Sequence, residues 1–259
     1  MNSHLLNLPT AILLFFAALV AGALNAVAGG GSFIAFPALL FTGVPAVPAN
    51  ATNTVALWTG LVCSGGAFRS RLRARRIVLV TLFTVSLIGG VIGALLLLKT
   101  PANTFLRILP WLMLAATLIF IFGPKLSERK QREIGNHQNA GALIAAALVQ
   151  LAIAVYGGYF GGGMGFVILA MLTAFGMADI HEMNALKAVL SSATNGLAVL
   201  VFILRDAVYW PQALLMIAGA AFGGYFGARF SLRISPVLIR RFVIAIGATL
   251  SAYFFLRAY

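Results

Sequence analysis

The sequence predicts an all-α polytopic membrane protein built from two inverted repeats of five helical segments. The first observation is composition: 61% of the 259 residues are hydrophobic and only 9% are charged, whereas a soluble domain carries roughly a quarter charged residues. The second is that the apolar runs are continuous and lack the alternation of barrel strands, which favours helices. The third is an internal duplication, which also sets the expected topology.

Ten apolar segments are expected along the chain. Two of them are too short to cross roughly 30 Å of hydrocarbon at about 1.5 Å per residue. Each of these follows a Gly-Gly-Gly triplet, so we expect a broken helix whose short second part returns against the segment before it. The ten segments lie at about residues 9–28, 32–44, 49–68, 77–98, 104–123, 139–158, 164–178, 183–204, 210–228 and 237–256, and the two short ones are the second and the seventh.

The two halves of the chain match at a fixed spacing. A shift of 134 residues pairs Asn50 with Asn184, and the two glycine triplets pair at a shift of 132. One hydrophilic stretch separates the halves. We therefore expect a first transmembrane repeat at 1–124, a cytoplasmic linker at 125–138 and a second, inverted transmembrane repeat at 139–259.

The charges in the loops predict the orientation of the repeats. Five segments in each copy is an odd number, so the copies should be inverted relative to each other across the membrane. Most of the 18 Lys and Arg residues then share one face, in the linker and the stretches 69–76 and 229–241. The positive-inside rule makes this face cytoplasmic and places the N-terminus outside. We expect a multi-pass protein of the plasma (inner) membrane whose net charge of +13 reflects orientation and not a nucleic-acid partner.

One motif recurs in both halves of the chain. Residues 21–53 read AGALNAVAGGGSFIAFPALLFTGVPAVPANATN, residues 155–187 repeat this stretch more weakly, and Gly-Gly-x-x-Gly-Ala occurs at 89–94 and 223–228. On these motifs the sequence resembles the TauE/SafE sulfite-exporter family, also called the TSUP permeases, over essentially the whole chain. The resemblance implies a secondary permease for sulfite, organosulfonates or related small anions. Members of the family differ in substrate and direction, so the motif indicates the family better than the substrate.

The two glycine triplets are the first candidates for binding a substrate. A short helix is expected after each triplet, and the first N–H groups of a helix lack intrahelical partners and carry partial positive charge. Two such N-termini that meet inside the membrane would form an anion site from the backbone. The alternative is that the glycines only let helices pack closely. The candidate residues are Gly29, Gly30, Gly31, Ser32, Gly161, Gly162, Gly163 and Met164.

Polar side chains follow each short segment and are further candidates. Asn50 and Asn53 are one helical turn apart, as are Asn184 and Lys187, and Ser191 continues the second face. Polar faces at membrane depth generally point into the helix bundle, where they can contact a substrate. The alternative for the asparagines is hydrogen bonding between helices or capping of a helix end.

Lys187 is the one Lys or Arg that falls inside an expected segment and not near its end. Its counterpart in the first repeat is the neutral Asn53, and Met164 likewise stands where the first repeat has Ser32, so these positions are not interchangeable. A lysine in hydrocarbon costs about 2.5–3.5 kcal/mol on insertion scales, which an anionic substrate would offset. The alternative is that Lys187 snorkels to the cytoplasmic interface or pairs with a carboxylate of the preceding loop.

That loop holds Asp179, His181 and Glu182. Histidine changes charge close to physiological pH, so this cluster could relay protons during transport. The alternative is a solvated loop that caps the following helix.

Together these observations predict a secondary transporter that moves small sulfur-containing anions by alternating access. Alternatives are a carrier of another small anion, such as a carboxylate, or a non-transporting membrane scaffold. We expect no enzymatic activity, cofactor or metal site, because the sequence has no nucleophile motif, metal-ligand spacing or phosphate loop. The expected partners are the anion, the lipid bilayer and protons as a coupling ion, and the sequence leaves open whether the chain forms a homo-oligomer.

Overall fold

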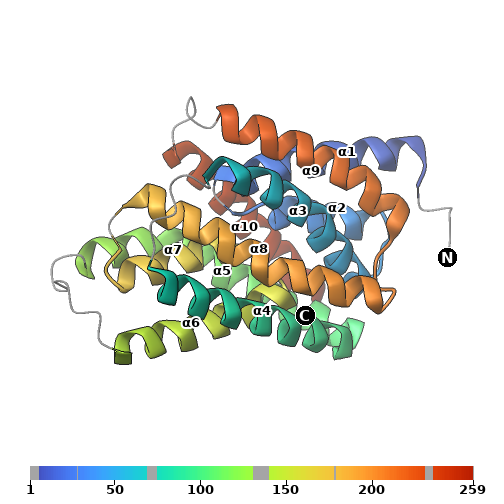
Figure 1. Cartoon of the computed structure of the whole chain (residues 1–259). Coiled ribbons are helices and arrows are strands. Elements are labelled where there is room, and N and C mark those ends of the chain that lie inside the picture. Colours follow the sequence, from blue (N-terminus) through green and yellow to red (C-terminus); the bar gives the residue numbers. More distant parts are fainter. Residues whose placement is uncertain are drawn as a thin grey trace.

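Ten α-helices make up the part of the chain that the computed structural model describes, which is residues 6–27, 29–68, 75–130, 140–177, 179–230 and 236–258. No strand occurs in these ranges, so the predicted all-α fold is confirmed. Helices suit these apolar runs because a helix satisfies its own backbone hydrogen bonds inside hydrocarbon. In chain order (Figure 1) they are α1 (Leu8–Val27), α2 (Ser32–Phe41), α3 (Ala46–Phe68), α4 (Arg76–Lys99), α5 (Ala102–Lys130), α6 (Ala140–Tyr159), α7 (Met164–Ala174), α8 (Ile180–Leu204), α9 (Trp210–Phe230) and α10 (Pro236–Ala258).

The helix lengths follow the expected segments. The helix α2 has 10 residues and α7 has 11, so at about 1.5 Å per residue each covers roughly half of the hydrocarbon thickness. Within the described residues, five helices are long and apolar enough to cross a membrane, namely α1, α4, α5, α6 and α8. These lengths and compositions are those of a multi-pass membrane protein.

The end of the first half differs from the expectation. The helix α5 runs on to Lys130, although the sequence stretch from residue 125 was expected to be a linker. Lys, Leu, Glu and Arg are good helix formers, so a polar stretch can continue a helix that hydropathy alone would end. The rest of the expected linker lies outside the described residues.

The five helices of the first half correspond in order to those of the second half. The helices α6 and α7 begin 132 residues after α1 and α2, and α8, α9 and α10 begin 134 residues after α3, α4 and α5. The contacts follow the same correspondence, because α1 packs on α9 and equivalently α6 packs on α4, while α3 packs on α8 and α5 on α10. In Figure 1, α1 and α9 lie along one edge of the molecule and α4 and α6 along the opposite edge.

Glycines on α9 let α1 approach closely. A Cβ atom added to Gly219 would collide with the carbonyl of Phe15, and one added to Gly227 would lie 2.5 Å from Cα of Ala23. The contact positions advance together along both helices, so α1 and α9 run in the same direction. Small residues at such positions bring helix backbones into van der Waals contact inside a membrane.

The helices α4 and α6 pack in the equivalent way. Nε2 of Gln150 donates a hydrogen bond to Oγ of Ser86 over 2.8 Å. About two turns further along α4, a Cβ atom added to Gly93 would lie 2.7 Å from the backbone nitrogen of Tyr159. These two helices are therefore also parallel to each other.

The helices α3 and α8 meet in the opposite sense. Nε1 of Trp58 donates to the carbonyl of Ser192 over 3.1 Å. The N–H of Tyr209, in the loop after α8 and directly before α9, donates to Oγ1 of Thr52 over 3.0 Å. Because the earlier position on α3 meets the later position in the second half, α3 and α8 run antiparallel.

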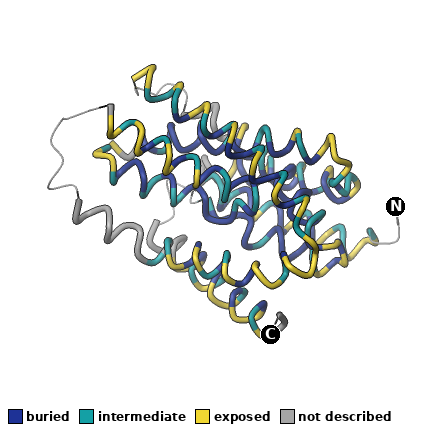
Figure 2. Tube along the Cα trace, turned by 90° about the horizontal axis from the view of Figure 1, so that it is seen from below, coloured by how far each residue is buried: buried dark blue, intermediate teal, exposed yellow. Residues whose placement is uncertain are grey.

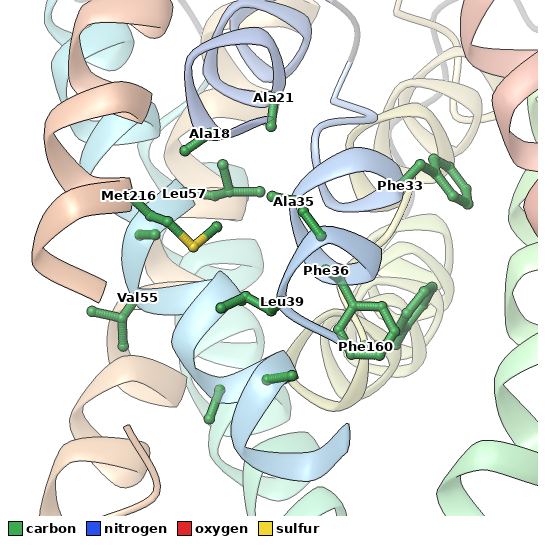
Figure 3. Close-up of a cluster of buried hydrophobic side chains, with 14 of the residues drawn as sticks. Ala18, Ala21, Phe33, Ala35, Phe36, Leu39, Val55, Leu57, Phe160 and Met216 are labelled. Carbon is green, nitrogen blue, oxygen red and sulfur yellow. The ribbon is translucent and has the colours of Figure 1, made fainter. Parts of the chain in front are cut away.

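An apolar core formed by both halves fixes the short helices. Figure 2 shows buried positions along the inward helix faces and exposed positions on the outer faces. In the core, the ring of Phe36 on α2 lies 6.0 Å from that of Phe160 (Figure 3) and 6.1 Å from that of Phe105. Both contacts have the edge-to-face geometry that aromatic pairs prefer. Phe160 directly precedes the second glycine triplet, so this packing also positions the glycines.

Candidate functional site

The first break joins α1 to α2 and is braced by an asparagine. Gly29 has φ +79°, a conformation that glycine adopts without steric cost, and its N–H donates to the carbonyl of Leu24 over 3.1 Å. The N–H of Gly31 donates to Oδ1 of Asn25 over 3.4 Å. A Cβ atom on Gly31 would collide with the carbonyl of Ala21, so this break needs glycine both for its turn and for a close approach.

The second break joins α6 to α7 and is braced by a tyrosine. Gly161 and Gly163 have φ +76° and +75°, whereas Gly31, the counterpart of Gly163, has φ −58°. The hydroxyl of Tyr156 donates to the carbonyl of Gly162. The two triplets have the same sequence but follow different backbone paths.

The helix N-termini at the breaks are already partly satisfied. The N–H of Phe33 donates to the carbonyl of Gly30 over 3.2 Å, and the N–H of Met164 donates to that of Gly161 over 3.3 Å. The partial charge of a helix end resides mainly on unsatisfied N–H groups. The backbone alone therefore offers less to an anion than the sequence suggested, and side chains have to contribute.

The first break touches the start of α7, which in turn meets α8. A Cβ atom added to Gly29 would lie 3.3 Å from Cα of Gly165, and one added to Gly165 would lie 3.3 Å from Cδ of Lys187. The start of the first break, the first turn of α7 and the first turns of α8 thus meet at one place. Without side chains on these two glycines, the contact between the halves is made backbone to backbone.

A small cavity lies where these segments meet. Its free volume is about 30 Å³, which is enough for water but small for an anion with several heavy atoms. Both halves of the chain contribute to its wall. The lining residues are Asn25, Ala26, Gly29, Ser32, Thr54, Leu57, Leu61, Gly161, Met164, Gly165, Asn184, Lys187, Ala188, Ser191 and Asn195.

Lys187 is the charged residue among those that line the cavity. It is buried, with 7% of its surface exposed, and its Nζ donates to Oδ1 of Asn184 over 2.9 Å. Neither Asp179 nor Glu182 is part of the wall, and Oδ1 of Asp179 accepts the N–H of Glu182 over 3.4 Å. Among the described side chains, the partner of Lys187 is therefore the neutral amide of Asn184. A buried cation whose partner is neutral attracts an anion strongly.

The helix α8 turns one polar face toward the cavity. Asn184, Lys187, Ser191 and Asn195 all line it, at spacings of three and four residues that place them on one side of a helix. The described part of the chain offers no hydrogen-bond partner to the hydroxyl of Ser191, and Oδ1 of Asn195 is buried without one. Hydrogen-bonding capacity on this face is therefore left for water or a substrate.

Several of the expected site residues brace the breaks and do not line the cavity. Nδ2 of Asn50 donates to the carbonyl of Tyr159 over 2.9 Å, and Nδ2 of Asn53 donates to Oγ of Ser32 over 3.2 Å. These bonds tie α3 to the end of α6 and to the start of α2. The wall also omits four of the six triplet glycines, namely Gly30, Gly31, Gly162 and Gly163.

The cavity also contains residues that the sequence analysis did not select. Asn25, Thr54 and Gly165 belong to its wall. The amide of Asn25 could have been found, because a polar side chain inside an apolar run at membrane depth is itself a signal of a site. Gly165 carries no such signal, since its role depends on a contact with a distant part of the chain. The side chain of His181, considered as a proton relay, lies outside the described residues.

Comparison with known proteins places the whole chain in one family. The family described as Sulfite exporter TauE/SafE matches residues 14–254. A probable membrane transporter protein of Haemophilus influenzae is 30% identical over 244 residues, which cover 93% of this chain and 92% of the relative. The probable membrane transporter protein YfcA of Escherichia coli K12 is 31% identical over 246 residues, which cover 92% of this chain and 87% of the relative.

A third relative covers the chain to a similar extent. The probable membrane transporter protein ORF9 of a Sinorhizobium species is 30% identical over 242 residues, which cover 92% of this chain and 89% of the relative. No solved structure matches the chain. The family match includes both glycine breaks and all of α8. This multi-pass membrane protein therefore belongs to the sulfite exporter TauE/SafE family.

Proposed function

We propose that the protein is a secondary transporter, and not an enzyme, that moves small sulfur-containing anions such as sulfite or organosulfonates across the plasma (inner) membrane. The observation that carries this proposal is the position of Lys187, a buried cation on the wall of a cavity between two glycine-rich breaks. The description of the family as sulfite exporters and the names of the relatives as probable membrane transporters support both transport and the substrate class.

The donors around the cavity suit an anion with several oxygens. Nζ of Lys187 supplies a charge, and the hydroxyl of Ser191 and the amides of Asn25 and Asn184 supply neutral hydrogen bonds from nearby walls. Sulfite and sulfonates both carry three oxygens on one sulfur, so one group can accept from several of these donors at once. Hydrogen bonds to a charged group contribute about 1.5–3 kcal/mol each, which offsets the cost of burying the lysine.

Alternating access fits the arrangement of helices around the cavity. Most pairs of packed helices match the pair five places later, α1 runs parallel to α9, and α3 runs antiparallel to α8. This pattern supports two inverted repeats, which open a central site to either face by moving relative to each other. With a free volume of about 30 Å³ the cavity would have to widen to admit the anion. Protons are the coupling ion that we expect.

Transport by the purified protein in liposomes tests this proposal. We would measure uptake of labelled sulfite, ethanesulfonate and acetate, with and without a pH gradient, and use Lys187→Gln as the matched control. The proposal predicts saturable uptake of the two sulfur anions, accelerated by a pH gradient, with little uptake of acetate. A preference for acetate would reassign the cargo to carboxylates, and a folded protein that moves none of the three would contradict transport.

A further inference from the structure

The two halves differ where each short helix meets the last helix of the other half. The helix α7 packs along α5, whereas α2 touches α10 at fewer positions. An open groove of about 510 Å³ lies there, between α1, α2 and α10. Its wall includes Leu13 and Ala17 of α1, Phe33 and Pro37 of α2, and Phe242 and Ile246 of α10.

The groove is apolar and faces the medium around the protein. Thr249 is the one polar residue in its wall, and Leu13 and Phe242 at its edge are 47% and 48% exposed. Phe33 projects from α2 on the side away from Leu39 (Figure 3) and is buried, so it forms the floor of the groove and not its exposed edge. Because α1 has the length and hydropathy of a membrane span, the medium at this surface is lipid, and a hydrocarbon chain is the ligand that such a groove takes.

A cation precedes the α10 residues that line the groove. Arg241 directly precedes Phe242 and lies four residues before Ala245, so it shares the face of α10 that lines the groove. Its side chain is exposed. The arginine fork matches the oxygens of a phosphate group, and basic residues near the ends of membrane helices attract anionic headgroups. We propose that the groove binds one acyl chain of an anionic phospholipid whose phosphate contacts Arg241.

A second copy of the chain fits the groove less well. A stable protein interface buries roughly 800 Å² on each partner, and it needs a broad complementary surface, whereas this feature is a concave slot between three helices. A protein partner would also leave Arg241 at the end of an apolar contact without an anion, which costs free energy. A phospholipid supplies a thin apolar chain and an anion in the same molecule.

An acyl chain in this groove would hold α2 away from α10. Ser32, the first residue of α2, lines the central cavity, so the lipid would influence the geometry of that site. This consequence rests on the proposed transport function, whereas the lipid site itself does not.

Native mass spectrometry of the purified protein in detergent tests the lipid site. Phosphatidylglycerol and phosphatidylcholine would each be titrated against the unmodified protein, Arg241→Gln and Ala245→Trp. Arg107→Gln is the matched control, because Arg107 is exposed on α5 at the position equivalent to Arg241, 134 residues earlier, and does not line the groove.

The proposal predicts that one phosphatidylglycerol binds, with a dissociation constant at least about tenfold lower than that of phosphatidylcholine. Arg241→Gln should remove this preference, Ala245→Trp should weaken binding of both lipids by filling the groove, and Arg107→Gln should change neither. Equal effects of the two arginine variants would overturn the proposal. So would a dimer that Ala245→Trp dissociates, since the occupant would then be a second copy. Failure to find this lipid preference would not change the uptake expected in liposomes. The lipid site and the transport function can therefore be disproved independently.

Discussion

The two glycine breaks have the same plan but use their polar residues differently. In the first break, Asn25 accepts the N–H of Gly31, and Asn53 donates to Ser32, so both amides hold the backbone in place. In the second break the position equivalent to Asn25 is Gly157, where an added Cβ atom would collide with the side chain of Met164. The position equivalent to Asn53 is Lys187, which lines the cavity.

The comparison separates what the architecture needs from what the site needs. Both halves form a helix, a break and a short helix with nearly the same lengths, so neither the charge of Lys187 nor the amide of Asn53 is required for that plan. The first half uses two amide side chains to stabilise its break, while the second half uses the hydroxyl of Tyr156 for its break and turns the polar face of α8 toward the cavity. This difference indicates that the second half supplies most of the chemistry for a bound anion.

The largest expected contrast concerns the orientation of equivalent loops. Arg75 precedes α4 and Arg205 follows α8, and both are exposed. In a background with Cys63→Ala, an impermeant thiol reagent added to intact cells should label Arg205→Cys and leave Arg75→Cys unlabelled, because inverted repeats place these loops on opposite faces. Labelling of both variants in intact cells, or labelling of both only after permeabilisation, would show that the repeats are not inverted.

The next largest effect is expected at the second break. Gly161→Val puts a β-branched residue at φ +76°, a conformation that costs roughly 1–2 kcal/mol per residue for L-amino acids and more for branched ones. We expect transport per folded molecule to fall by at least about tenfold. Gly141→Val is the control, since no atom lies within 4 Å of a Cβ added there, and equal rates for the two variants would remove the break from the mechanism.

Smaller effects are expected from one variant in each half, which should change stability in the first half and anion affinity in the second. Asn53→Ala removes the bond to Ser32 and should lower the free energy of unfolding by about 1–3 kcal/mol, with little change in anion affinity. Ser191→Ala removes a hydroxyl that lines the cavity, and should weaken anion binding by about two- to tenfold at unchanged stability. Thermal unfolding measures the stability of both variants, and ligand titration measures their affinity for the anion. If both variants lose stability and affinity to the same extent, the two halves do not differ in role.

The sequence contains enough information to predict the ten helices and their correspondence. Hydropathy marks the long helices, and the glycine triplets mark the starts of α2 and α7 at Ser32 and Met164. The spacing of Asn184, Lys187 and Ser191 also places them on one face of α8, which is the face that lines the cavity. These features are local, so periodicity and composition are sufficient to find them.

Other features depend on contacts between segments far apart in the chain and could not be predicted. Asn53 has the same spacing from Asn50 as Lys187 has from Asn184, yet its amide bonds to Ser32 and does not line the cavity. The contact between Gly29 and Gly165 joins two halves whose relative position no local pattern encodes. The groove beside α2 likewise depends on how far α10 lies from it.

The central claim is that Lys187 holds the anion, and titration of the purified protein with labelled sulfite tests it most directly. Lys187→Gln keeps a polar donor but removes a charge-assisted contact of about 1.5–3 kcal/mol. The dissociation constant should therefore rise by about one to two decades relative to the unmodified protein, with unfolding unchanged. Lys187→Glu should bind still more weakly, because it places like charge against the anion. An unchanged dissociation constant in a normally folded Lys187→Gln would contradict the account.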